Sequence, residues 1–145
     1  MKRRLLVSLT VLGVLAVAVL VFGVSLANNQ GRDEFTNNIT YRDPDRSEPI
    51  AVDLSYELDA SRTEQYHIRT RSSPRLAISW ASPAGEPGVE IVLEGDQGVV
   101  QQVQAQGTQC QTWAVEPDTT YTLSVTLNPG SGQFSAAWQE AASCA

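Results

Sequence analysis

The sequence predicts an all-β domain, an antiparallel β-sandwich of about eight strands with a jelly-roll-like pattern, preceded by one N-terminal transmembrane or signal helix. Three observations support this fold class. From residue 50 to residue 138, apolar and polar side chains alternate in short runs, which is typical of half-buried strands. Turns rich in proline and glycine separate these runs. Outside residues 5–27, no stretch shows the helical spacing of apolar residues.

The N-terminal helix is expected over residues 5–27, an unbroken run without a charged residue that follows three basic residues at positions 2–4. A helix of this length measures about 34 Å, enough to cross a hydrocarbon core of about 30 Å. The basic residues place the N-terminus in the cytoplasm and the C-terminal domain outside the cell membrane. The alternative is a cleaved secretory signal, because Ser25-Leu26-Ala27 offers small residues where signal peptidase cuts. In that case the domain is secreted after cleavage at Ala27.

A polar linker is expected over residues 28–49, where Pro44 and Pro49 interrupt any regular element. Apolar residues within 35–41 depart from the composition of a disordered segment, so part of this stretch could instead add an edge strand to the domain. Asn38-Ile39-Thr40 is a glycosylation acceptor sequence, which matters only in a secretory system that uses it.

The β-sandwich domain is expected over residues 50–145. Its strands are assigned from the alternation of side chains along each run. In chain order, the expected strands and the residues that share one face are 50–59 (Ile50, Val52, Leu54, Tyr56, Leu58), 64–71 (Tyr66, Ile68, Thr70), 75–81 (Leu76, Ile78, Trp80), 89–93 (Val89, Ile91, Leu93), 99–105, 110–115 (Trp113, Val115), 120–127 (Tyr121, Leu123, Val125, Leu127) and 134–138 (Phe134, Ala136, Trp138).

Turn chemistry sets the ends of these strands. Residues 82–88 contain two prolines and end the third strand, because proline cannot continue a central strand. Residues 95–98 (Gly-Asp-Gln-Gly) connect the fourth and fifth strands as a hairpin. Residues 116–118 and 128–132 supply the turns on either side of the seventh strand. The glutamine-rich piece 101–109 is polar enough to be an exposed edge strand.

Net charge and cysteine content limit the possible partners and the possible chemistry of the chain. The net charge of −6 becomes −9 when the three basic residues before the apolar run are left out, which disfavours nucleic acid as a partner. Cys110 and Cys144 are the only cysteines, and in an exported chain an even pair predicts a disulfide. The bond would pin the tail to the sixth strand and stabilise the domain by about 3 to 4 kcal/mol. A redox or metal-binding thiol pair is the alternative, but neither CxxC spacing nor a nearby histidine supports it.

The second half of the domain resembles the pre-peptidase C-terminal type of small bacterial extracytoplasmic β-sandwich. The resemblance rests on a turn that leads into a Tyr-x-Leu-x-Val strand at 118–125, and on a glycine-rich hairpin that returns through Phe-Ser at 130–135. Strands at 66–68 and 89–93 occupy the corresponding earlier places, so the likeness covers about residues 58–138. It implies an extracytoplasmic fold. The family usually accompanies a secreted protease or another enzyme module, and this sequence contains none.

The sequence offers no recognisable catalytic constellation. His67 is the only histidine, and no Gly-x-Ser-x-Gly elbow or other nucleophile signature accompanies it. Glu90 and Glu94 fall on the outer face of one strand and so do not form a paired-carboxylate cleft. The acidic cluster at 43–48 lacks the glycine and the terminal glutamate of an EF-hand, which favours a solvated loop over a calcium site. We therefore expect no enzyme, no cofactor and no metal.

Two groups of residues could bind a ligand. Trp80, Trp113 and Trp138 could form a platform on which sugars stack, but alternation places each on the aliphatic side of its strand and favours the core.

The second group is a basic row on the outer side of the second strand, His67, Arg69 and Arg71, with Arg62 and Arg75 nearby. This row could receive an acidic partner, a carboxylated glycan or lipid headgroups. The favoured alternative is a solvated strand face whose arginines pair across the sheet with Asp53, Glu57 or Asp59.

Two functional hypotheses follow. The first is a non-enzymatic, membrane-tethered extracytoplasmic interaction domain, an accessory subunit of an envelope assembly that binds a protein partner. It is motivated by an apolar segment, a short linker and a compact domain without catalytic chemistry. The alternative is a secreted or anchored module that binds cell-wall carbohydrate, motivated by the three tryptophans and the sandwich fold. Fold class by itself does not decide between these two hypotheses.

Overall fold

The computed structural model describes residues 33–82, 88–141, 143 and 144, and the expected N-terminal helix lies outside them. The described residues belong to one compact unit that starts at Asp33. Among them, no helix is long and apolar enough to cross a membrane. They contain nine strands, β1 (Glu34–Tyr41), β2 (Pro49–Leu58), β3 (Arg62–Arg69), β4 (Arg75–Ala81), β5 (Val89–Gly95), β6 (Gly98–Ala105), β7 (Thr108–Ala114), β8 (Thr120–Leu127) and β9 (Gly130–Glu140).

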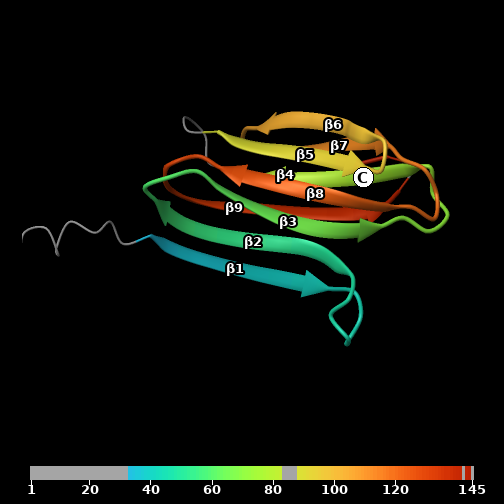
Figure 1. The fold of residues 1–145 in the computed structure, drawn as a ribbon, viewed down its shortest axis with the longest axis horizontal. Helices are drawn as coiled ribbons and strands as arrows, with labels where there is room; N and C mark the ends of the chain where they lie inside the picture. The colour runs from blue at the N-terminus through green and yellow to red at the C-terminus, as the bar shows by residue number, and fades with distance from the viewer. Residues whose placement is uncertain (1–32, 83–87, 142, 145) are drawn as a thin grey trace, which may run out of the picture. The chain divides into compact units, whose positions relative to one another are not determined.

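The strands form two antiparallel sheets, which confirms the β-sandwich expected from the sequence (Figure 1). The five-stranded sheet has the order β1-β2-β9-β4-β7, and the four-stranded sheet has the order β3-β8-β5-β6. Strands β1 and β3 are edges on one flank of the sandwich, whereas β6 and β7 are edges on the opposite flank (Figure 1). Both the predicted third and seventh strands have the expected bounds, as β4 and β8.

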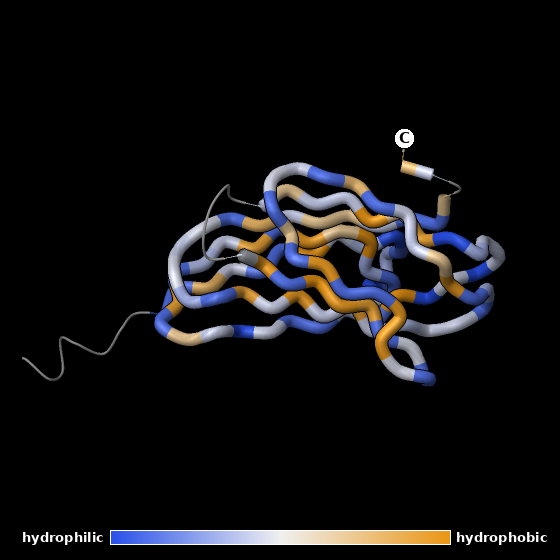
Figure 2. The backbone as a smooth tube through the Cα atoms, turned by 90° about the horizontal axis from the view of Figure 1, so that it is seen from above, coloured by the Kyte–Doolittle hydropathy of each residue, from blue (hydrophilic) through white to orange (hydrophobic). Residues whose placement is uncertain are grey.

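The hydrophobic core lies between the sheets and takes side chains from both. Leu54, Ile78 and Phe134 come from the five-stranded sheet, and Ile91 and Leu123 come from the four-stranded sheet; each is 2% exposed or less. Apolar and polar residues alternate along the strands, as Figure 2 shows by the alternating orange and blue of the backbone tube. Burying one such aliphatic or aromatic side chain contributes about 1.5 to 3 kcal/mol, so this shared core is the main source of stability.

The first strand lies inside the stretch expected to be a polar linker. Strand β1 pairs along its length with β2, so the domain begins at Asp33 rather than at residue 50. The physical reason is that Phe35 and Ile39, opposite Tyr56 and Val52, pack against the core, while the intervening polar residues stay on the solvent side. The edge strand considered for 35–41 is therefore present.

The predicted disulfide is formed. Cys110 in β7 is bonded to Cys144 in the tail after β9, with the two Cα atoms 5.9 Å apart. The bond fastens the tail across the outer face of the five-stranded sheet, since Cys110 lies opposite the outward-facing Ser79 of β4.

Two buried hydroxyl groups fix the turn before β8. The hydroxyl of Thr70 donates to the carbonyl of Glu116 at 2.6 Å and accepts from the backbone N–H of Thr119 at 3.1 Å. The hydroxyl of Tyr121 accepts from the backbone N–H of Glu116 at 2.7 Å. These bonds hold Asp118, whose φ of 52° is in the left-handed region, beside the end of β3.

Candidate functional site

The basic residues predicted as a binding surface come from three different elements. His67 and Arg69 lie on the outer face of the four-stranded sheet, through β3. Arg71 follows β3 in the loop that crosses to the other sheet, and Arg75 begins β4 within the five-stranded sheet. His67 and Arg69 line one small hollow with Glu48 and Glu140, which both bond to Arg71, so these three basic residues lie near one another.

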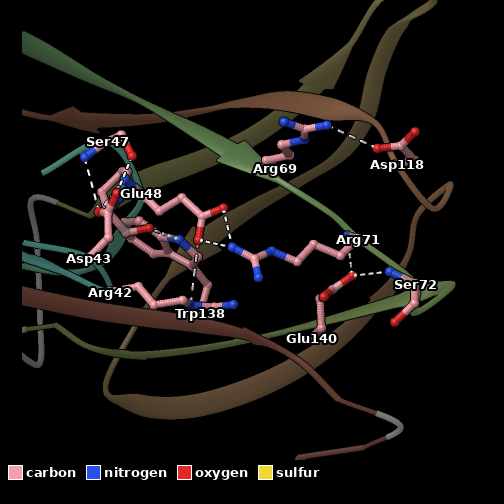
Figure 3. Close-up of polar contacts among 11 residues, drawn as sticks. Arg42, Asp43, Ser47, Glu48, Arg69, Arg71, Ser72, Asp118, Trp138 and Glu140 are labelled. Atoms are coloured by element: carbon pink, nitrogen blue, oxygen red, sulfur yellow. Dashed lines mark hydrogen bonds and ion pairs between the residues drawn. The ribbon is translucent and has the colours of Figure 1, made fainter. Parts of the chain in front are cut away.

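Acidic partners neutralise three of the arginines, as the close-up in Figure 3 shows for two of them. Arg71 Nη2 donates to both carboxylate oxygens of Glu48, at 2.8 and 2.9 Å, and this contact raises the pKa of Arg71. Arg69 Nη2 lies 3.2 Å from a carboxylate oxygen of Asp118. Arg62 Nε lies 2.7 Å from Glu64, and its guanidinium sits 3.7 Å from the centre of the Phe35 ring.

The prediction that the arginines of the basic row pair with Asp53, Glu57 or Asp59 across the sheet is wrong. Alternation alone placed the first two expected strands as neighbours, but β2 belongs to the five-stranded sheet and β3 pairs with β8 in the other. His67 accordingly faces Thr122 of β8, with its ring nitrogen 3.4 Å from the threonine hydroxyl.

Glu140, at the end of β9, is held by the loop between β3 and β4. One carboxylate oxygen accepts the backbone N–H groups of Arg71, Ser72 and Ser73 at 2.6, 3.1 and 3.2 Å. Partial burial raises the pKa of Glu140, but these donors outweigh it, and the pKa falls below its usual value. The three N–H groups form a nest for an anion, and the chain fills it with its own carboxylate.

The three tryptophans are buried, so the predicted core role is confirmed, and they do not form the sugar-stacking platform that was considered as the alternative. Trp80, Trp113 and Trp138 are 2%, 5% and 4% exposed. Trp138 Nε1 donates to the carbonyl of Pro49 at 2.8 Å, and Trp113 Nε1 donates to the side chain of Gln111 at 3.0 Å.

The acidic cluster at 43–48 forms a hydrogen-bonded turn. Asp43 accepts the backbone N–H groups of Ser47 and Glu48, at 3.0 and 3.1 Å, and also the hydroxyl of Ser47. The Ser47 hydroxyl is the main reason that the pKa of Asp43 is lowered. No group of three or more metal-ligating side chains occurs within the described residues.

The main hollow of the described surface is a cleft of about 700 Å³ on the outer face of the five-stranded sheet. The strand register explains its position, because Asn38 of β1, Asp53 of β2 and Ser135 of β9 stand in one row across the sheet. Ser55 and Gln133 stand opposite each other in the next row. All five alternate with core residues and so point outward, and short serine side chains between longer ones leave the hollow.

A second hollow of about 410 Å³ lies on the same face. Its floor consists of small side chains that the register also brings together, Ala51, Ala137 and Ser79. The Cys110–Cys144 disulfide lines it and holds the tail against it as a wall.

The polar groups of the main cleft are hydroxyls, amides and a single carboxylate, that of Asp53. No lysine, arginine or histidine is among its described lining residues. Phe134 is the aromatic residue in the lining, but it is only 1% exposed, so no ring is available for stacking. The cleft can therefore bind through hydrogen bonds, to a ligand rich in hydroxyl groups and without negative charge.

Comparisons with known proteins do not identify a family. No protein-family model and no curated protein sequence matches this chain. Among solved structures, a family 11 carbohydrate-binding module from Clostridium thermocellum, in complex with a β-1,3-1,4-mixed-linked tetrasaccharide, is 9% identical with a TM-score of 0.43, over 74% of this chain and 81% of that chain. The module TmCBM61, in complex with β-1,4-galactotriose, is 12% identical with a TM-score of 0.40, over 77% of this chain and 90% of that chain.

The enzymatically active domain of tailspike protein 4 from bacteriophage CBA120 is 11% identical with a TM-score of 0.40, over 73% of this chain and 17% of that chain. Likenesses as distant as these assign neither a ligand nor a function to this chain.

Sequence reasoning missed the cleft. Alternation correctly placed Asp53 and Ser55 on the outer side of their strand. It could not show that residues near position 134 would stand beside them, because β9 inserts between β2 and β4. The sequence did contain a sign of the cleft, because several of the outward residues of β2 and β9 are small.

Proposed function

We propose that this chain is a non-enzymatic binding module that holds a neutral glycan in the cleft on the outer face of the five-stranded sheet. The observation that carries the proposal is the row Asn38, Asp53 and Ser135, with Ser55 and Gln133 beside it, which lines a hollow of about 700 Å³. Side-chain amides and hydroxyls both donate and accept hydrogen bonds, which matches the alternating hydroxyls of a sugar chain.

The chemistry of the cleft sets the expected ligand class and affinity. A carboxylate without a basic side chain beside it repels phosphorylated and acidic sugars, so a neutral glycan is the better fit. Each hydrogen bond contributes about 0.5 to 1.5 kcal/mol in net terms, and without aromatic stacking a few such bonds give a dissociation constant of about 1 mM.

Calorimetric titration tests this function. The purified chain is titrated with neutral oligosaccharides of the cello, manno and N-acetylchito series. At least one series is expected to bind with a dissociation constant of about 1 mM or lower. Gln133→Ala should weaken that binding about fivefold, the effect of losing one hydrogen bond of about 1 kcal/mol.

Gln65→Ala is the matched control, because Gln65 is an exposed glutamine on the outer face of the other sheet. It should leave the affinity unchanged. The proposal is wrong if no neutral series binds at several times this concentration, or if the two variants weaken binding equally.

We also infer that the module works outside the cytoplasm, held at a membrane by residues 5–27. The disulfide supports an oxidising compartment, since such bonds are rare where thiols are kept reduced. The apolar run, which lies outside the described residues, supports the anchor. The intact mass of the native protein in the membrane fraction should include residues 1–27, whereas a soluble form that begins at Asn28 would mean a cleaved signal and a secreted module.

A further inference from the structure

Strand β6, an edge of the four-stranded sheet, is a surface feature separate from the glycan cleft. It hydrogen-bonds to β5 on one side and pairs with no described strand on the other. No charged residue occurs from Gln97 to Val115, a stretch that includes all of β6 and β7. Such an edge presents unpaired backbone N–H and C=O groups, which proteins normally protect with charged side chains or proline.

The other flank of the sandwich shows that protection. Strand β3 carries Arg62, Glu64 and Arg69, and strand β1 begins with Glu34. The pairing of β6 with β5 has one irregularity, next to Leu93, and such a bulge can hinder the addition of a further strand. The stretch from Gln101 to Ala105 pairs regularly with β5 and has no such bulge. Strand β6, like β7 on the same flank, is thus an edge on which another strand meets few obstacles, and β6 carries the exposed apolar side chains.

Exposed apolar side chains accompany this edge. Val99 and Val100 are 59% and 41% exposed, and they are the large hydrophobic residues that stand out as exposed among the described residues. Beside them lies a hollow of about 440 Å³ whose lining includes Val115 and Tyr121. Unpaired backbone and apolar contact area therefore occur together at one place, the combination used when a strand is added to a sheet edge.

We propose that β6 pairs antiparallel with β6 of a second copy of this chain, joining the two four-stranded sheets into one continuous sheet. The protein partner expected from the sequence is then another copy. The proposal stands independently of the glycan function.

Charge confines the approach of a second copy to this flank of the domain. Four of the ten basic residues precede Asp33 and none of the sixteen acidic residues does, so residues 33–145 carry 6 − 16 = −10 charges. Two such domains repel each other wherever charged surfaces approach within a Debye length of about 8 Å. The flank formed by β6 and β7 bears no charge along either strand, so it is where two acidic copies can meet.

Strand composition is compatible with self-pairing. A two-fold axis normal to the sheet places each side chain of β6 opposite a side chain of the same strand in the other copy. Opposed like charges would prevent this arrangement, and β6 offers only glutamine, valine, alanine and glycine. The pairing would also cover the exposed valines.

The geometry leaves the glycan cleft open. Pairing takes place at the edge of the four-stranded sheet, whereas the cleft lies on the outer face of the five-stranded sheet. If the proposed glycan function holds, the pair carries two clefts and gains avidity for a polymeric ligand.

Sedimentation velocity of the full chain in a mild detergent, without glycan, tests the pairing. The native chain is expected to form dimers. Gln102→Lys places an ammonium in the middle of β6, close to the same ammonium of the second copy, and keeps a donor for Glu90, to which the Gln102 amide now donates. This variant should raise the dimer dissociation constant at least tenfold.

Thr36→Lys is the matched control, because Thr36 is an exposed residue on the opposite edge strand β1. It should dimerise like the native chain. A native chain that stays monomeric overturns the proposal and points to a strand of another protein. Equal dimerisation of Gln102→Lys and the native chain also overturns it, by assigning the contact to another part of the molecule.

Site-directed cross-linking checks the register independently of stability. The two native cysteines are bonded to each other, so Gln102→Cys introduces the single free thiol. A short bismaleimide should convert this variant to a covalent dimer at least ten times more efficiently than Thr36→Cys. Equal yields from the two positions would rule out β6 pairing.

Discussion

At the scale of single residues, several charged side chains of this domain bond to other parts of the fold. Arg69 and Arg71 illustrate this, since their guanidinium groups are used by Asp118 and Glu48. Glu140 does the same with a carboxylate, which fills a backbone nest. Two arginines of the basic row therefore contact carboxylates of the domain itself.

Glu140 makes the stability of the domain depend on pH. Its folded-state pKa is lowered, so the stabilisation is fully present above the ordinary glutamate pKa of about 4.3 and is lost as pH falls through the lowered value. Glu140→Gln should lower the free energy of unfolding at pH 7, with a penalty that shrinks below about pH 4. Urea unfolding from pH 7 to pH 2 measures this.

Glu57→Gln is the matched control for this series, because Glu57 is exposed on the outer side of β2. It should produce a much smaller change at pH 7. A Glu140→Gln penalty that persists undiminished at the lowest pH would show that the carboxylate charge does not provide the stabilisation.

Sequence alternation predicts the orientation of side chains well at this scale. Trp80, Trp113 and Trp138 all face the core as expected, because a period of two places every second residue on one side. Ala77 is the informative exception. It faces outward yet is 3% exposed, because it is small and lies on a central strand between β7 and β9, a position that alternation does not encode.

At the scale of elements, the existence of strands could be predicted but their partners could not. The β5–β6 hairpin predicted from the Gly-Asp-Gln-Gly turn is confirmed. The glycine-rich hairpin expected at 130–135 is wrong, because β8 pairs with β3 and β5 whereas β9 pairs with β2 and β4 in the other sheet. Strand β1 was placed in a linker because its outward residues are polar and two prolines follow it. Its inward residues, Phe35 and Ile39, carried the correct signal.

The disulfide is the element-level feature with the largest expected effect. Cys110 and Cys144 are 34 residues apart, and closing such a loop stabilises a domain by about 3 to 4 kcal/mol. The double variant Cys110→Ser, Cys144→Ser should unfold at a correspondingly lower urea concentration. The native chain should show the same loss in the presence of reductant.

The double variant itself serves as the control for reductant, because its melting temperature should not respond to it. Equal melting temperatures of the native chain with and without reductant would contradict the assignment. The second hollow should also lose its wall in the variant, since the bond holds the tail beside Ala77 and Ser79.

At the scale of the whole molecule, the cleft is a product of strand order. Its lining residues come from β1, β2, β9 and the end of β4, and β9 is far from the other three in the sequence although it lies between β2 and β4 in the sheet. A single sequence supplies the outward direction of Asp53 and Gln133 but not their proximity. The tryptophans, which are conspicuous in the sequence, were the wrong reason to expect carbohydrate binding, because they are buried. The proposal rests instead on serine and amide side chains that the strand order brings together.

The most direct test of the account is to map the perturbed backbone amides of the ¹⁵N-labelled chain by NMR during titration with the neutral oligosaccharides. We expect the largest shifts at Asn38, Asp53, Ser55, Gln133 and Ser135, and no change on the outer face of β3 and β8. Shifts confined to the four-stranded sheet, or no shift with any series at several millimolar, would contradict a glycan site in this cleft.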